Sequence, residues 1–346
     1  MSNKLTEYLN TFTEAGWLAA VDELLPCIHE VDREAVQIWF RFYPLDLMRY
    51  IASADDREEA LRGFALQGDF ELKDQIDTSH HFLYGHRHWK VIKAAIEAES
   101  VVFKDETPTL LEEIKAIGML VAEKLKIERQ MVNAMAAIGL ATLNQVGIDA
   151  FKAASGETKK PTGIKAKSPN AVIAERAKDD SQGIFGFLKT VDKKYSVKYA
   201  NGRVEGKFDV MNDQDIANAS ANDRSQNWKN EDDRCWGGVV PVECLSASCG
   251  TCWVGVLGGR EKLSEVSPRE TRSMKVFGYN QPEGEKPFLR LACQSKAFGN
   301  ATIVIPPWNG VFGKKVRGNV EELELEPATT SAKALREAVA TAASGE

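Results

Sequence analysis

The chain has 346 residues, of which 43% are hydrophobic and 27% are charged, so it has the composition of an ordinary soluble protein and is long enough for two domains. A net charge of −6, without a basic run carrying interleaved aromatic residues, argues against nucleic acid as the main partner. The first residues lack the apolar stretch of a secretory signal peptide, so we expect a cytoplasmic protein.

Apolar residues recur at helical spacing through residues 1–154, which predicts an all-α N-terminal domain. One helix is expected over 33–42, with Asp32 as its N-cap. The stretch 130–153 is long and mostly apolar, but asparagine, glutamine and aspartate residues interrupt it. We therefore predict a buried helix of a bundle and no transmembrane span, with a peripheral membrane or partner contact as the alternative.

Four of the five histidines fall within nine residues, at His80, His81, His86 and His88. Neutral imidazole is the commonest metal ligand, so one interpretation is a second metal or haem in the N-terminal domain. Neither the C-x-x-C-H nor the H-E-x-x-H spacing is present. The alternative is a structural turn at Gly85, with the histidines hydrogen-bonded at the start of a helix.

The pattern changes in the second half of the chain. The segment 155–190 opens on a run rich in Gly, Pro, Ser and Lys, which predicts a linker, followed by a short connecting helix at about 170–178 that the apolar residues 184–188 would dock. Alternating apolar residues then follow, and Asn201-Gly202 marks the turn of a hairpin that opens a sheet. We expect a second domain over 191–316 and a docking or disordered tail over 317–346.

Three cysteines spaced C-x4-C-x2-C, and a fourth forty-one positions later, form the most specific pattern of the sequence: Cys244, Cys249, Cys252 and Cys293. This is the plant-type spacing of ligands for a [2Fe–2S] cluster. A short loop can supply three thiolates, while the fourth comes from another element. The small residues between the first three allow backbone N–H groups to point at the sulfurs, which stabilises the cluster's negative charge.

Other interpretations of the four cysteines fit less well. Structural zinc usually takes two C-x2-C pairs, and only one pair here has that spacing. Disulfides require an oxidising compartment, for which the sequence shows no secretory signal. A Rieske centre requires two histidines as ligands, and the sequence has no histidine after residue 88. Of the remaining cysteines, we expect Cys27 to be a buried small hydrophobe. Cys235, nine residues before the first ligand, is the alternative ligand.

The runs 241–252 and 290–294 resemble the [2Fe–2S] ferredoxin family, and the long gap before the fourth cysteine is similar to its adrenodoxin branch. The resemblance covers 191–316 and implies a β-grasp ferredoxin-like domain there. With the all-α domain that the helical spacing predicts before it, we expect an α+β, two-domain chain in which a helical bundle precedes the ferredoxin-like domain. It also implies that the four cysteines are the iron ligands. Ala247 departs from the family, in which many members have glycine, and the polar segment 212–235 departs as well.

The resemblance implies one-electron transfer. We expect an electron carrier, or an electron-transfer subunit of a larger oxidoreductase of the hydrogenase or dehydrogenase type or of a membrane chain, rather than an enzyme in its own right. No dinucleotide fingerprint follows a predicted strand. The alternative is a metal- or haem-containing oxidoreductase or sensor, in which the His-rich domain is the active centre and the ferredoxin domain supplies electrons.

Charge bears on the choice of redox partner. Residues 191–318 hold 19 Lys and Arg against 15 Asp and Glu, a balance of +4. The helix expected after the third ligand carries Arg269, Arg272 and Lys275, whereas the soluble shuttles of the family are typically acidic. We therefore expect a more acidic partner, or permanent attachment to a complex.

Overall fold

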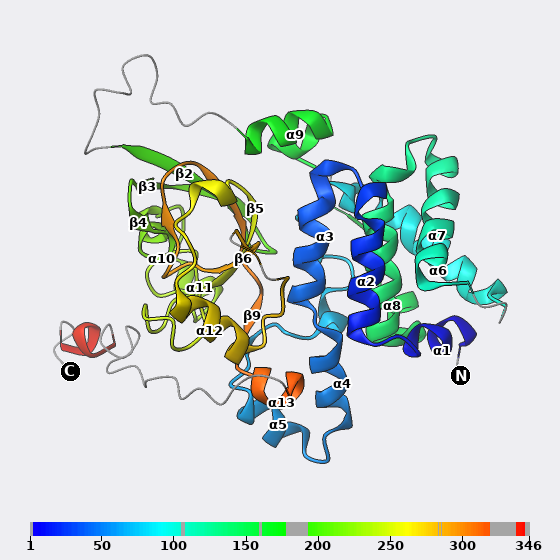
Figure 1. Ribbon diagram of the computed structural model, residues 1–346, viewed down its shortest axis with the longest axis horizontal. Coiled ribbons are helices and arrows are strands. Elements are labelled where there is room, and N and C mark those ends of the chain that lie inside the picture. The colour runs from blue at the N-terminus through cyan, green and yellow to red at the C-terminus, as the bar shows by residue number, and fades with distance from the viewer. Residues whose placement is uncertain are drawn as a thin grey trace. The chain divides into compact units, whose positions relative to one another are not determined.

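The computed structural model describes residues 3–104, 108–158, 161–177, 193–282, 284, 286–318 and 337–342. It has a mixed α+β fold, with helices in the N-terminal region and a mixed sheet in the C-terminal part (Figure 1). The chain divides into two compact units, which we call the helical unit (Met1–Ser53 and Glu71–Glu175) and the sheet unit (Ala54–Phe70 and Arg176–Glu346).

The helical unit is built around one long helix. Helix α8 packs against several of the other helices, and all its residues from Asn133 to Asn144 are buried. The α-helices of this unit are α1 (Lys4–Asn10), α2 (Glu14–Leu24), α3 (Glu30–Phe42), α4 (Leu45–Ser53), α6 (Trp89–Val102), α7 (Leu110–Leu125), α8 (Asn133–Ala153) and α9 (Pro169–Arg176). Short 3-10 turns connect them at η1 (Leu25–Cys27), η2 (Leu72–Gln75), η3 (Tyr84–His88), η4 (Arg129–Met131) and η5 (Gly163–Ala166).

Helix α8 is also the one helix in the described ranges whose length and apolar character would suffice to cross a membrane. Of its most apolar eighteen-residue window, 67% is buried.

The start of α3 differs from the prediction. The helix begins at Glu30, and the N-cap is His29, whose Nδ1 accepts the N–H of Val31 at 3.3 Å. Asp32 lies in the first turn, where its carboxylate accepts the N–H groups of Tyr84 (2.6 Å) and Gly85 (2.8 Å). The prediction of Asp32 as the cap was therefore wrong, because this carboxylate instead holds the start of η3.

The main sheet of the sheet unit has five strands in the order β3-β2-β8-β5-β6. Strand β2 is antiparallel to β3 and parallel to β8, while β5 is antiparallel to both β8 and β6. The predicted hairpin is present, because the N–H of Asn201 donates to Val204 at 3.2 Å and Gly202 has a φ of +84°. The strands are β2 (Lys194–Ala200), β3 (Glu205–Met211), β5 (Trp253–Gly258), β6 (Leu289–Leu291) and β8 (Ala301–Val304).

Shorter elements complete the sheet unit. Two two-stranded sheets are formed by β1 (Gln67–Gly68) with β9 (Trp308–Asn309) and by β4 (Gln214–Asp215) with β7 (Lys296–Ala297). The helices are α5 (Arg57–Gly63), α10 (Ile216–Ala219), α11 (Trp228–Glu231), α12 (Pro268–Phe277) and α13 (Gly313–Arg317), with 3-10 turns η7 (Ser220–Asn222) and η8 (Arg260–Lys262). In the predicted tail, residues 337–342 are helical and the rest of 319–346 lies outside the described residues.

The two units divide the chain differently from the predicted domains. The segment 54–70 belongs to the sheet unit, where β1 pairs with β9 and the N–H of Val311 donates to the carbonyl of Phe64 at 2.7 Å. The first part of the predicted linker belongs to the helical unit, where the hydroxyl of Ser155 donates to Asp77 at 2.8 Å. The predicted short connecting helix, at about 170–178, is present as α9 (Pro169–Arg176), whereas the apolar residues 184–188, which we expect to dock it, lie outside the described residues.

Candidate metal centre

The sheet brings the cysteine loop and the fourth cysteine together. The loop ends at Cys252, directly before β5, and Cys293 lies two residues after the end of β6. Because these strands are antiparallel neighbours, with Trp253 opposite Leu291, the start of one and the end of the other lie at the same edge. The N–H of Ala292 donates to the carbonyl of Cys252 at 2.9 Å and fixes this approach.

The loop backbone is wound so that its N–H groups face sulfur. Leu245 (φ +57°), Ala247 (φ +61°) and Gly250 (φ +74°) are left-handed. The N–H groups of Ser246 and Ser248, which lie between these turns, donate to Cys244 Sγ at 3.4 and 3.3 Å. Such concave runs of N–H groups bind anions. In this loop Leu245 and Ala247 adopt the left-handed conformation, which is unfavourable for residues other than glycine.

The four thiols form two contacting pairs, Cys244 with Cys249 and Cys252 with Cys293. A hydrogen bond from the Cys249 thiol and the backbone N–H groups lower the pKa of Cys244 to about 4, and the same contact raises the pKa of Cys249. A hydrogen bond from the Cys252 thiol likewise lowers the pKa of Cys293, and the pKa of Cys252 is raised. Each pair therefore favours one thiolate, and none of the four is in a disulfide.

This donor set fits a dinuclear cluster. Two sulfur pairs match two ligands per iron, and the N–H groups aimed at Cys244 suit a negatively charged cluster. The side-chain amide of Gln294 also lies 3.5 Å from Cys293 Sγ. Across the described ranges, no three His, Cys, Asp or Glu side chains are grouped as a single metal-ion site would require.

Aromatic side chains support the loop from beneath. The hydroxyl of Tyr279 donates to the carbonyl of Gly250 at 3.0 Å, and its ring stacks on Trp253 with the centroids 3.9 Å apart. Phe277 fills the space where a Cβ on Gly250 would stand, 2.9 Å away. Burial raises the pKa of Tyr279, so the phenol remains a neutral donor to the loop.

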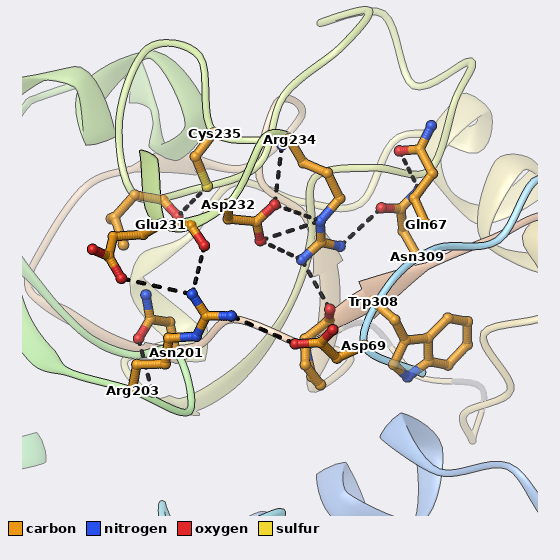
Figure 2. Close-up of polar contacts among 12 residues, drawn as sticks. Gln67, Asp69, Asn201, Arg203, Glu231, Asp232, Arg234, Cys235, Trp308 and Asn309 are labelled. Atoms are coloured by element: carbon orange, nitrogen blue, oxygen red, sulfur yellow. Dashed lines mark hydrogen bonds and ion pairs between the residues drawn. The ribbon is translucent and has the colours of Figure 1, made fainter. Parts of the chain in front are cut away.

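A small polar cavity of about 200 Å³ lies beside the loop. Its wall contains Arg234, whose guanidinium donates to the Asp232 carboxylate (2.7 Å), to Asn309 (2.9 Å) and to the Pro307 carbonyl (3.0 Å), as Figure 2 shows in part. These bonds tie the segment before the cysteine loop to β9. The cavity is lined by Gln67, Gly68, Asp233, Arg234, Trp236, Val242, Glu243 and Thr251.

The two remaining cysteines are separate from the pairs. The thiol of Cys235 donates to the carbonyl of Val239 at 3.3 Å, and burial raises its pKa to about 12. Cys27 is exposed, so the expectation of a buried hydrophobe was wrong. It ends η1, and its carbonyl accepts the side-chain amide of Asn133 at 2.8 Å.

The structure brings two of the four clustered histidines together. His80 Nδ1 lies 2.8 Å from His86 Nδ1, and His80 Nε2 lies 3.2 Å from the carbonyl of Ile76. His81 Nδ1 is bonded to the carbonyl of Thr78 at 3.1 Å, and His88 directly precedes α6. Burial lowers the pKa of His80, and lowers those of His81 to about 3 and of His86 and His88 to about 4, so all four rings are neutral.

Comparison of the chain with protein-family models, curated proteins and solved structures finds no match.

Proposed function

We propose that the sheet unit is a [2Fe–2S] ferredoxin domain and that the chain is a one-electron carrier or an electron-transfer subunit of a larger oxidoreductase. The observation that carries this proposal is the pairing of Cys244 with Cys249 and of Cys252 with Cys293 beneath donated N–H groups. Two thiolates for each of two irons is the ligand set that plant-type clusters require.

The strand order supports the finer fold assignment. Along the chain, β2 is the first strand of the main sheet and β8 is the last. In the order β3-β2-β8-β5-β6 these two are neighbours inside the sheet and run parallel, as expected of a β-grasp sheet. Helix α12 follows β5 and precedes β6, and the cysteines lie at the ends of these two strands. This is the arrangement that the resemblance to the adrenodoxin branch implies.

A bound cluster of this kind takes up and releases one electron at a low potential, about −400 mV for plant-type ferredoxins. The protein's own residues set the surroundings in which this happens. The N–H groups of Ser246 and Ser248 stabilise negative charge on sulfur, and the packed rings of Trp253 and Tyr279 exclude water from the inner side of the loop.

A metal or haem in the helical unit is the second candidate. The hydrogen bonds of His80 favour the electron carrier over this candidate, because both ring nitrogens are engaged, one with His86 and one with a backbone carbonyl, and neither is left to bind a metal. In the electron-carrier proposal, the helical unit attaches the carrier to a larger redox enzyme or to a membrane-bound chain.

Metal and sulfide analysis of the anaerobically purified full chain, with visible and electron paramagnetic resonance spectra, tests the proposal. We expect two irons and two acid-labile sulfides per chain, and a paramagnetic signal that appears on reduction by one electron. Colourless protein without labile sulfide would overturn the assignment, and additional iron, copper or zinc would favour the second candidate.

Single serine variants of the four paired cysteines are expected to lose most of the labile sulfide. Cys27→Ser and Cys235→Ser are matched controls, because one side chain is exposed and the other bonds to Val239. Both controls should keep the full cluster content. Loss of labile sulfide in the Cys235→Ser variant, with full sulfide content in one of the four paired-cysteine variants, would mean that Cys235 is a ligand in place of that cysteine.

A further inference from the structure

The exposed charged residues of α12 are all basic. Arg269, Arg272 and Lys275 are exposed, at intervals of three residues. The one acidic residue of the helix, Glu270, is 1% exposed and is paired internally with Arg290. The helix therefore presents three positive charges and no negative charge to solvent.

Helix α13 extends this positive surface. The N–H of Phe312 donates to the carbonyl of Phe277, the last residue of α12, at 3.0 Å. Gly313 begins α13 against the same helix end, so closely that a Cβ there would stand 2.2 Å from the carbonyl of Lys275. The next two residues of α13, Lys314 and Lys315, are exposed. We call Arg269, Arg272, Lys275, Lys314 and Lys315 the basic ridge.

The basic ridge reaches the cysteine loop. Arg269 Nη2 donates to the hydroxyl of Ser248 at 3.3 Å, and the N–H of Ser248 donates to Cys244 Sγ. At the other end of α12, Phe277 contacts Gly250 of the same loop. A protein bound on the ridge would thus lie next to the loop, and electron transfer requires such proximity because its rate falls steeply with distance.

We propose that the basic ridge is the docking surface for the acidic face of an electron-transfer partner protein. Clustered charge of one sign steers a partner of the opposite sign and raises the rate of encounter at low salt. The ridge gathers five positive charges on two adjoining helices of a chain whose net charge is −6. This inference rests on the proposed electron-transfer function.

The first test uses two small oxidants of opposite charge, hexacyanoferrate(III) and hexaamminecobalt(III), with the reduced full-length protein in stopped flow. In each reaction one electron passes from the reduced cluster to the oxidant, whose metal goes from +3 to +2, and no proton moves. We expect the anionic oxidant to react faster at low salt and to slow as salt is added. The double variant Arg272→Glu/Lys275→Glu should slow it about tenfold and should accelerate the cationic oxidant.

The matched control is Lys194→Glu/Lys207→Glu, which makes the same change of charge on the β2–β3 hairpin, at the edge of the sheet opposite β6. It should leave both rates within about twofold of the unmodified protein. Equal effects of the ridge and hairpin variants would mean that only net charge matters, and would overturn the docking surface.

Calorimetric titration with poly-L-glutamate, a probe for an acidic face, gives a readout that does not depend on electron transfer. The unmodified protein and the hairpin variant should bind it, and the ridge variant should bind at least tenfold more weakly. Retained binding by the ridge variant would overturn the docking surface. A visible spectrum of every sample separates the two proposals, because protein without a cluster contradicts the ferredoxin function, whereas the titration still tests the ridge.

Discussion

Arg290 and Glu270 form a buried two-point ion pair, with Nε 2.8 Å from Oε1 and Nη2 3.0 Å from Oε2. Their side chains are 2% and 1% exposed. The carboxylate also accepts the N–H of Leu291 at 2.8 Å, and the guanidinium donates to the carbonyl of Ser264 at 2.9 Å. The pair joins α12, which carries the basic ridge, to the strand that leads to Cys293.

The substitution Glu270→Gln leaves the Arg290 charge buried without a counter-charge. We expect the free energy of unfolding in urea to fall by about 3–5 kcal/mol, the usual cost of breaking a buried pair. Asp213→Asn is the control, because it breaks the pair with Lys296, in which the side chains are 55% and 50% exposed. The control should lose less than about 1 kcal/mol. Similar losses in the two variants would contradict the burial of the first pair.

Figure 2 shows two arginines, one buried and one exposed, that allow a second matched comparison. Arg234 is 4% exposed and bridges Asp232 to β9, whereas Arg203 is 56% exposed and pairs with Asp69 and Glu231. Arg234→Gln should lower the free energy of unfolding by about 3 kcal/mol, and Arg203→Gln by less than about 1 kcal/mol. Urea titrations of the two variants decide the matter, and an equal cost would speak against Arg234 as the anchor.

Local patterns in the sequence identified much of this molecule. Helical periodicity indicated the helices of the N-terminal region, because a one-sided apolar stripe follows from the helix repeat. Alternation and Asn201-Gly202 predicted the first hairpin. Cysteine spacing singled out four thiols, which the structure brings into two pairs, and their role as iron ligands stays a prediction. In each case the signal lies within a few residues, or in a motif whose spacing is itself the chemistry.

What the sequence could not reveal depends on contacts between distant residues. The pairing of β1 with β9 joins Gln67 to Asn309, and no periodicity marks a two-residue strand. The bridging role of Arg234 follows from the position of Pro307, which no local pattern places. Asp32 carried a genuine capping signal, but the N–H groups of η3 engaged its carboxylate.

Ala247 provides a test of backbone strain in the cysteine loop. Its φ of +61° is unfavourable for alanine and far worse for a β-branched residue. Ala247→Gly should keep the full labile sulfide content and Ala247→Val should lose most of it, as measured on protein reconstituted with iron and sulfide. A valine variant with full cluster content would show that the loop adopts another conformation when loaded.

The buried histidines predict a loss of stability in mild acid. The pKa of His80 is well below 6.5 in the folded state, mainly through burial, and that of His86 is about 4. As the pH falls below about 6.5, the unfolded chain binds protons that the folded chain does not, so the free energy of unfolding falls by at most about 1.4 kcal/mol per pH unit for each histidine. Urea titrations at pH 7.5 and 5.5 measure this slope, and His86→Gln should flatten it.

Glu113 acts in the opposite sense and supplies the control. Burial raises the pKa of its carboxyl to about 7, so the folded state binds a proton as the pH falls through 7, while the unfolded state binds it only near 4.5. Glu113→Gln should therefore steepen the acid loss that His86→Gln flattens. Parallel slopes in the two variants would contradict the assignment of neutral, buried imidazoles.

Gly68 tests whether the segment 54–70 is an integral part of the sheet unit. Its φ is +81°, and a Cβ there would stand 2.3 Å from the carbonyl oxygen of Pro307. Gly202 has nearly the same φ, +84°, with nothing within 4 Å of its Cβ position. The left-handed conformation should destabilise both alanine variants by about 1–2 kcal/mol. Only Gly68→Ala must also displace the backbone of Pro307, which directly precedes β9.

We therefore expect Gly68→Ala to lower the free energy of unfolding in urea by clearly more than Gly202→Ala does. It should also weaken retention of the cluster, because Arg234, which lies 2.9 Å from the same Cβ position, anchors the segment before Cys244. If the two substitutions lower the free energy of unfolding equally, the β1–β9 pairing contributes nothing to the stability of the sheet unit, and residues 191–318 should fold and hold a cluster without the segment 54–70. If they differ as expected, a fragment that lacks 54–70 should be less stable than the full-length chain.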